Sequence, residues 1–112
     1  MNASSWTTVC PVERLVPERG VPALVGGVQV AVFRLADDRV LAVQQRDPYS
    51  GANVLSRGIV GSTGPTPTIT SPMYKQVWDL TTGRCLDASG KEPEDLRTFQ
   101  VQVEDGAVRV RA

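Results

Sequence analysis

The sequence predicts an all-β protein of short antiparallel strands, and three observations support this fold class. Val28–Arg34 carries Val at every second position, the period-2 pattern of a strand with one buried face. Gly26-Gly27 and Asp105-Gly106 are dipeptides that supply the positive φ angles of tight hairpin turns. No segment shows the apolar period of a long amphipathic helix. The pattern therefore favours a β-sandwich or barrel of about nine or ten strands.

The individual strands are predicted from runs of β-branched and aromatic residues between turn signals. The expected strands, in chain order, are residues 6–10, 21–25, 28–34, 40–45, 59–62, 68–70, 76–79, 84–86, 99–104 and 108–110. A short helical turn is expected over residues 12–15, and a loop or short helical turn over residues 54–58. Residues 63–67 contain a Gly and two Pro and are predicted to form a stiff, exposed connection. The polar segment 87–95 is predicted to be a surface loop.

Length and charge favour a single domain and argue against nucleic-acid binding. A chain of 112 residues fits one domain and buries about 65% of the surface of its unfolded form. Twelve Lys and Arg balance twelve Asp and Glu, and aromatic residues make up 5% of the chain. A β-barrel that binds nucleic acid needs a cationic groove and stacking aromatic side chains. This composition provides neither.

The N-terminus and the cysteines predict a cytoplasmic protein. Residues 1–6 lack the basic region and apolar run of an export signal, and no segment has enough apolar residues to span a bilayer. Without an export signal, Cys10 and Cys85 are expected as reduced thiols, although a disulfide between them is a less favoured alternative. Cys85 follows a turn and is predicted to be a small buried side chain rather than a reactive thiol.

Two proline-containing loops lie within residues 46–83. Asp47-Pro48-Tyr49 and Ser71-Pro72-Met73-Tyr74 have the spacing of a Rieske iron–sulfur site, in which each loop supplies one Cys and one His. The positions with this spacing are Asp47, Tyr49, Ser71 and Tyr74. A carboxylate is a hard ligand, and a Ser hydroxyl or Tyr phenol stays protonated at neutral pH, so none is suited to the cluster. The chain has no His, which also removes the base of Ser-His-Asp and Cys-His catalysis.

These loops and their flanks resemble the small subunit of assimilatory NAD(P)H-dependent nitrite reductase, a Rieske-like domain that lacks the cluster ligands. The resemblance covers about residues 6–110. The matching segments occur in the family's order and are Asp47-Pro48-Tyr49, Val54-Leu55-Ser56-Arg57-Gly58, Ser71-Pro72, Lys75-Gln76, Trp78-Asp79-Leu80 and Gly83-Arg84-Cys85. The resemblance implies one Rieske-like domain over residues 1–112, with a smaller, formerly cluster-binding lobe at about residues 46–83.

The function implied by this resemblance is that of a non-catalytic, cofactor-free subunit of an oxidoreductase. The partner would be the large subunit, which in this family carries sirohaem, an iron–sulfur cluster and FAD and uses NAD(P)H to reduce nitrite to ammonium. No catalytic, cofactor-binding or metal-binding residue is expected in this chain. The alternative is a stand-alone, cluster-free module that docks onto another oxidoreductase. Co-purification with a sirohaem protein would distinguish the two hypotheses.

Four residues near the loops are candidates for contact with a partner: Arg57, Lys75, Tyr49 and Tyr74. The two cations are either docking residues or ordinary solvated charges. For the two Tyr residues we favour a packing role, in which each ring buries on the order of 150 Å² in the space of the missing cluster. We therefore expect the loops to pack on each other with at least one Tyr ring at their junction. Asp47 is expected to accept hydrogen bonds from nearby backbone N–H groups.

Overall fold

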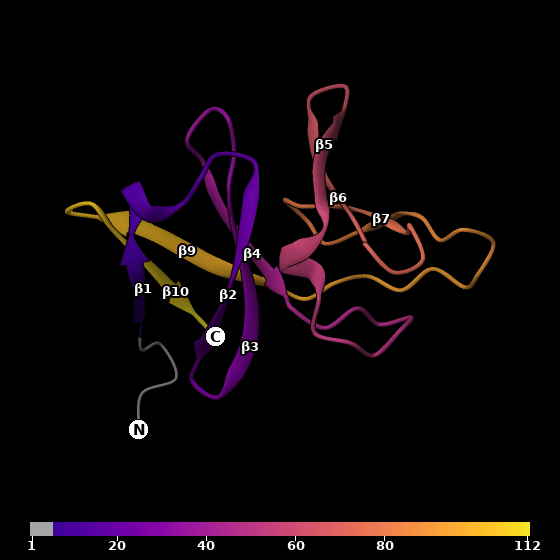
Figure 1. Ribbon diagram of the computed structural model, residues 1–112, viewed down its shortest axis with the longest axis horizontal. Coiled ribbons are helices and arrows are strands. Elements are labelled where there is room, and N and C mark those ends of the chain that lie inside the picture. The colour runs from indigo at the N-terminus through magenta and orange to yellow at the C-terminus, as the bar shows by residue number, and fades with distance from the viewer. Residues whose placement is uncertain (1–5) are drawn as a thin grey trace.

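The computed structural model describes residues 6–112, which form ten strands in two antiparallel sheets (Figure 1). The first sheet has the order β1-β10-β9-β4-β3-β2 and the second has the order β5-β6-β7-β8. The strands are β1 (Thr7–Pro11), β2 (Arg19–Val25), β3 (Val28–Arg34), β4 (Val40–Gln44), β5 (Ile59–Thr63), β6 (Thr66–Thr70), β7 (Val77–Asp79), β8 (Cys85–Asp87), β9 (Thr98–Glu104) and β10 (Ala107–Arg111). Residues 1–5, where the sequence predicts no export signal, lie outside the described part.

Two short 3₁₀ helices complete the described fold. They are η1 (Val12–Arg14) and η2 (Leu55–Arg57), each within a segment where the sequence predicts a helical turn. Among residues 6–112, no helix has both the length and the hydrophobicity that crossing a membrane requires. In Figure 1, η2 lies between the two sheets, so it connects them in space as well as in sequence.

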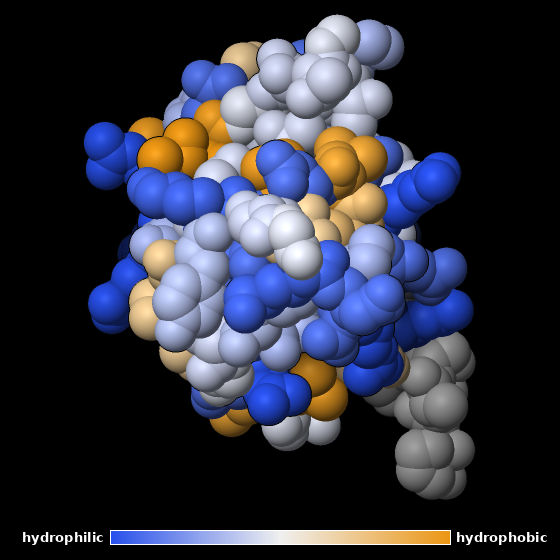
Figure 2. All heavy atoms as spheres, turned by 90° about the vertical axis from the view of Figure 1, so that its right-hand side faces the viewer, coloured by the Kyte–Doolittle hydropathy of each residue, from blue (hydrophilic) through white to orange (hydrophobic). Residues whose placement is uncertain are grey.

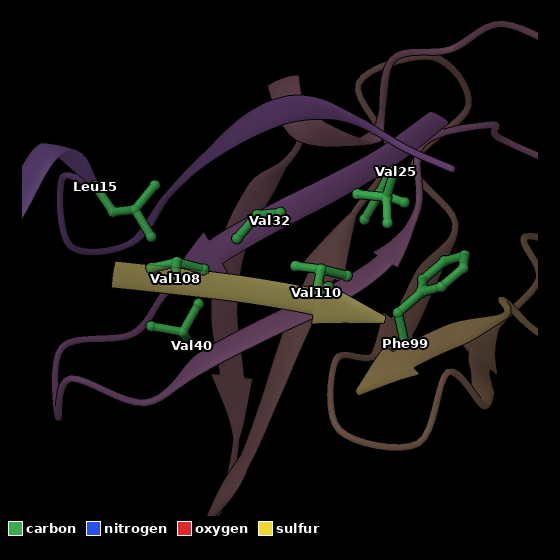
Figure 3. Close-up of a cluster of buried hydrophobic side chains, with 9 residues drawn as sticks. Leu15, Val25, Val32, Val40, Phe99, Val108 and Val110 are labelled. Carbon is green, nitrogen blue, oxygen red and sulfur yellow. The ribbon is translucent and has the colours of Figure 1, made fainter. Parts of the chain in front are cut away.

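The first sheet is built from the hairpins that the sequence predicts. Val25 pairs with Val28 around Gly26 and Gly27, whose φ angles of 56° and 81° are those that the tight turn needs. β3 has the predicted bounds. The inward side chains of these strands form an aliphatic core, and Figure 3 shows its members pointing toward one another. The buried members are Leu15, Val25, Val30, Val32, Val40, Ala42, Phe99, Val108 and Val110.

The second sheet differs from prediction at its first hairpin. The expected exposed connection over residues 63–67 is wrong, because β6 begins at Thr66 and Pro67 is buried. The turn consists of Gly64 and Pro65 alone. Pro67 fits in an inner strand because its carbonyl faces β7 and accepts a hydrogen bond from the Leu80 N–H at 2.9 Å. The N–H that Pro lacks would face that same neighbour, so one ladder bond is missing there.

A second hydrophobic core joins the two sheets. It contains Phe33 and Val43 from the first sheet, Leu55 from η2, and Ile69 and Trp78 from the second sheet, all at 0% exposure. Trp78 is a core residue, as the sequence predicts. The two loops of interest emerge from this region, one after β4 and the other between β6 and β7. The core therefore fixes where both loops begin.

Candidate functional site

A buried hydrogen bond joins the two loops directly. The Ser71 hydroxyl donates to Oδ2 of Asp47 at 2.5 Å, and the two residues are 1% and 0% exposed. These are the two positions where a Rieske site would carry thiolates on a shared iron. The expectation that the loops pack on each other is confirmed. The residues that form the contact are Asp47 and Ser71, however, and not the tyrosines.

Each loop is also held by hydrogen bonds of its own. The second carboxylate oxygen of Asp47 accepts from the backbone N–H of Tyr49 at 2.8 Å and of Ser50 at 3.4 Å, as predicted for Asp in a turn. In the second loop, the Ser71 hydroxyl accepts from the Met73 N–H at 3.1 Å, and the Ser71 N–H donates to the Gln76 carbonyl at 2.9 Å. Both loops are therefore rigid turns whose short polar side chains replace missing backbone partners.

Tyr49 attaches the first loop to the end of the second sheet. Its ring lies 6.0 Å from that of Trp78, at an interplanar angle of 32°. Its hydroxyl donates to the Glu92 carbonyl at 2.7 Å and accepts from the Glu94 N–H at 2.8 Å. Burial, and then the Cys85 thiol 3.8 Å away, raises the pKa of the Tyr49 phenol. Tyr49 thus fixes the 87–95 loop.

Tyr74 does not fill the space of a cluster, and that expectation is wrong. Its side chain is 52% exposed, and its neighbours Pro72, Met73 and Lys75 are exposed as well. Lys75 adopts a positive φ of 68°, which turns the chain sharply toward β7. The Tyr74 ring therefore lies on the outside of this turn rather than between the loops.

Arg57 lies beside the edge of the first sheet. It is the last residue of η2 and lines a surface groove together with Arg19 of β2. The sequence places Arg57 close to the first loop along the chain, but η2 positions it beside the first sheet. The four predicted contact residues therefore have different surroundings, since Tyr49 packs on Trp78 while Tyr74 and Lys75 are exposed on the second loop.

The sequence analysis missed Gln76, which is completely buried. Neither its amide nitrogen nor its amide oxygen has a hydrogen-bond partner among the described residues. The signal was present, because Gln76 stands two positions before the core residue Trp78 and side chains at i and i+2 share one face of a strand. Buried side-chain amides normally have partners, so Gln76 is costly where it lies.

The residues at the loops do not fit an iron–sulfur cluster. Asp47 already accepts hydrogen bonds on both oxygens, and the Ser71 hydroxyl is used as both donor and acceptor. Across residues 6–112, no group of three or more His, Cys, Asp and Glu side chains is arranged to hold a metal ion. Both cysteines are free and partly buried, and burial raises the pKa of the Cys10 thiol. Cys85 lies beside Tyr49 and not at a ligand position.

The two-sheet fold and the paired loops define a Rieske-like domain, and comparisons with known proteins agree. A family model described as a Rieske-like [2Fe-2S] domain matches residues 5–111. The nitrite reductase (NADH) small subunit of Escherichia coli strain K12 is 35% identical over 96% of this chain and 98% of its own. A Mycobacterium tuberculosis crystal structure assigned as an NADH-dependent nitrite reductase small subunit superimposes with a TM-score of 0.88 and 43% identity, over 96% and 94% of the two chains.

A third relative places the same domain in a longer protein. The Klebsiella oxytoca nitrite reductase [NAD(P)H] large subunit is 38% identical over 94% of this chain, which corresponds to 11% of that protein. This chain belongs to the Rieske-like family and, within it, to the small subunits of NAD(P)H-dependent nitrite reductase, an oxidoreductase.

Proposed function

We propose that this chain is a cofactor-free subunit that docks onto a large catalytic subunit in the cytoplasm and supports its reduction of nitrite to ammonium. The large subunit would carry sirohaem, an iron–sulfur cluster and FAD. The observation that supports this proposal best is the Asp47–Ser71 hydrogen bond, which joins the two loops where a cluster would be bound. A cluster could bind there only if both loops were rebuilt. The role left to such a domain is recognition.

The second loop supplies a suitable recognition surface. Met73 and Tyr74 are 45% and 52% exposed, beside the exposed cation Lys75. Tyrosine is enriched among residues that dominate binding energy, and a loop that is already rigid loses little entropy on docking. Figure 2 shows the end of the molecule that carries the second sheet, where the surface is mostly hydrophilic with small separate hydrophobic patches. A few residues, and not a broad apolar face, would therefore carry the affinity.

The test is reconstitution with the large subunit from the same organism. We expect the tagged chain to co-purify with it, to bring a sirohaem visible spectrum, and to raise the rate of nitrite-dependent NAD(P)H oxidation. The isolated chain should be colourless and free of iron. Co-purification with an unrelated oxygenase and no nitrite reductase would contradict the proposal and favour the stand-alone module.

Substitutions in the second loop locate the contact. Tyr74→Ala and Lys75→Glu should each weaken the complex by about tenfold, the size expected for residues that dominate an interface. Lys91→Glu makes the same charge change at another exposed position and is the matched control. Equal affinity for all three variants and the wild type would exclude this loop as the contact.

A further inference from the structure

Within residues 6–112, the outer edge of β5 is free. β5 is the last strand of its sheet and pairs there with β6 alone. The Pro67 carbonyl points to β7, so alternation along β6 directs the hydrogen-bonding groups of Thr66, Thr68 and Thr70 toward β5. Their partners on β5 are Thr63, Gly61 and Ile59. The backbone N–H and C=O groups of the two intervening residues, Val60 and Ser62, therefore point away from the sheet.

This edge has none of the features that normally protect a free strand. β5 reads Ile-Val-Gly-Ser-Thr, with no charged residue and no proline. Four of its five residues are exposed, and the Ile59 side chain is 65% exposed. The β5–β6 hairpin also stands out from the rest of the molecule (Figure 1). Exposed edges of this kind recruit another strand, and natural monomers usually block them with charges, prolines or bulges.

A groove runs along this edge and is bounded on its other side by the edge of the first sheet. Its wider part, about 540 Å³, lies between Gly58, Ile59 and Val60 on one side and Glu18, Arg19 and Gly20 on the other, with η2 at its end. A further cavity of about 180 Å³ continues past Val60 to Ser62. The register of β2 with β3 makes the backbone groups of Gly20 point outward as well. The groove therefore presents unpaired backbone groups from both sheets.

The charges at this groove favour an acidic occupant. Arg19 and Arg57 are exposed at its wider part, and neither forms an ion pair within the described residues. Glu18 is the single acidic residue that lines this part, and the narrower continuation adds Asp37, which is paired with Arg39. A second copy of β5 would bring no carboxylate to these cations, because β5 has no acidic residue. Charge complementarity therefore points to a different chain.

We propose that an extended, carboxylate-bearing segment of the large subunit adds as a strand to the outer edge of β5, in the groove between β5 and β2. The backbone of Val60 and Ser62 would supply the hydrogen bonds, and Arg19 and Arg57 would bind the carboxylate. Strand addition uses main-chain bonds for affinity and side-chain contacts for specificity. This proposal rests on the proposed function and adds a contact separate from the second loop.

Residue-resolved amide exchange by NMR tests the proposal on the wild-type chain, alone and in complex with the purified large subunit. The amides of Val60 and Ser62 should be unprotected in the free chain and slow by at least tenfold in the complex. The amides of Ile59, Gly61 and Thr63 face β6 and should change much less. This alternation is a signature of strand addition that burial of the whole hairpin would not produce.

A matched pair of variants tests the backbone contact. Ser62→Pro removes an outward N–H at an exposed position, and Ser62→Ala keeps that N–H while removing the hydroxyl. We expect Ser62→Pro to weaken the complex about tenfold and Ser62→Ala to stay within twofold. Because the proline substitution can disturb the hairpin, the free Ser62→Pro variant must show the same NMR chemical shifts in β6 and β7 as the free wild-type chain.

A charge-reversal pair tests the acidic occupant. The double variant Arg19→Glu with Arg57→Glu should weaken binding at least tenfold, whereas Arg84→Glu, on the turn before the opposite edge strand β8, should not.

The outcomes separate the two proposals. If the complex forms and Val60 and Ser62 stay unprotected, or if the groove variants bind like the wild type, strand addition is wrong and the proposed function stands. If the isolated chain dimerises with these two amides protected, the occupant is a second copy and the inference is overturned. If no complex forms with the wild-type chain, the proposed function itself fails.

Discussion

The two halves of this molecule are stabilised by different means. The core of the first sheet contains nine buried residues, all hydrophobic and mostly Val. Every buried polar side chain among the described residues lies instead between positions 45 and 76, around the loops and η2. These residues are Gln45, Asp47, Ser56, Thr68, Ser71 and Gln76. The difference teaches that the two loops, which lack a cluster, are joined by a polar network added to the apolar core beneath them.

The polar network is local and specific. The Gln45 amide donates to the Ser56 hydroxyl at 2.8 Å and accepts from the Ser56 N–H at 2.7 Å, so the start of the first loop is fixed to η2. The Asp47–Ser71 bond then fixes the first loop to the second. A buried hydrogen bond fixes orientation more narrowly than aliphatic packing does, because its loss leaves an unpaired polar group.

The largest effect should come from the apolar core. Leu15→Ala should lower the free energy of unfolding by about 3 kcal/mol, because a 1% exposed Leu leaves a cavity when truncated. Urea unfolding measures this, with Leu24→Ala as the control, since Leu24 is 65% exposed. The exchange rates of the loop amides in native Leu15→Ala should stay unchanged. Faster exchange of the loop amides would contradict the distinction between the two halves, because it would mean that the core of the first sheet also stabilises the loops.

The next largest effect should come from the bond between the loops. Asp47→Ala should lower the free energy of unfolding by about 2 kcal/mol, because it removes a charged acceptor and leaves buried donors unpaired. Ser71→Ala should cost less, and the double variant should cost less than the sum of the two. A double-mutant cycle by urea unfolding gives this coupling. Strict additivity would mean that the two side chains contribute independently.

A smaller, pH-dependent effect should come from Tyr49. Tyr49→Phe removes the hydroxyl that binds Glu92 and Glu94 and should cost about 1 kcal/mol at neutral pH. Because the pKa of Tyr49 is raised in the folded state, its stabilisation is complete below the unfolded value of 10.0 and is lost as pH rises through the folded value. Thermal unfolding between pH 8 and pH 11 should therefore show a steeper loss for the wild type. Parallel curves for the two proteins would contradict the assignment.

The smallest effect should come from Gln76, and its sign is opposite. Gln76→Leu replaces a buried, unpartnered amide with an apolar group of similar size and should raise the free energy of unfolding by about 0.5 kcal/mol. Differential scanning calorimetry measures the shift in Tm. A clear loss of stability would show that an internal water satisfies the amide and that the polar network extends one residue further.

The fold was largely predictable from local signals, and the loop contacts were not. The alternation of Val over residues 28–34 and the Gly-Gly turn depend on neighbours in the chain, and both were placed correctly. The start of β6 was misplaced because Pro67 looks like a strand breaker until its orientation toward β7 is known. The family resemblance, and not composition, selected the Rieske-like fold.

Contacts between distant positions explain the misses at the site. The sequence identified Asp47 and Ser71 as former ligand positions, but their bond joins residues 24 positions apart. The exposure of Tyr74 follows from the left-handed conformation of Lys75, a residue type that gives no warning of a positive φ. Gln76 stands two positions before Trp78, so the two side chains share one face. Its polar side chain nevertheless suggests exposure, and only the structure shows that this face is covered.

Two glycines leave no clearance around η2. A Cβ atom at Gly20 would lie 2.6 Å from the Ser56 carbonyl oxygen, and one at Gly58 would lie 2.5 Å from the Thr70 carbonyl oxygen. The small helix is therefore wedged between the backbones of β2 and β6, and Thr70 directly precedes the second loop. Even one added methyl group at either glycine would have to push η2 away from β2 or from β6, so the groove and the base of the second loop both depend on these two glycines.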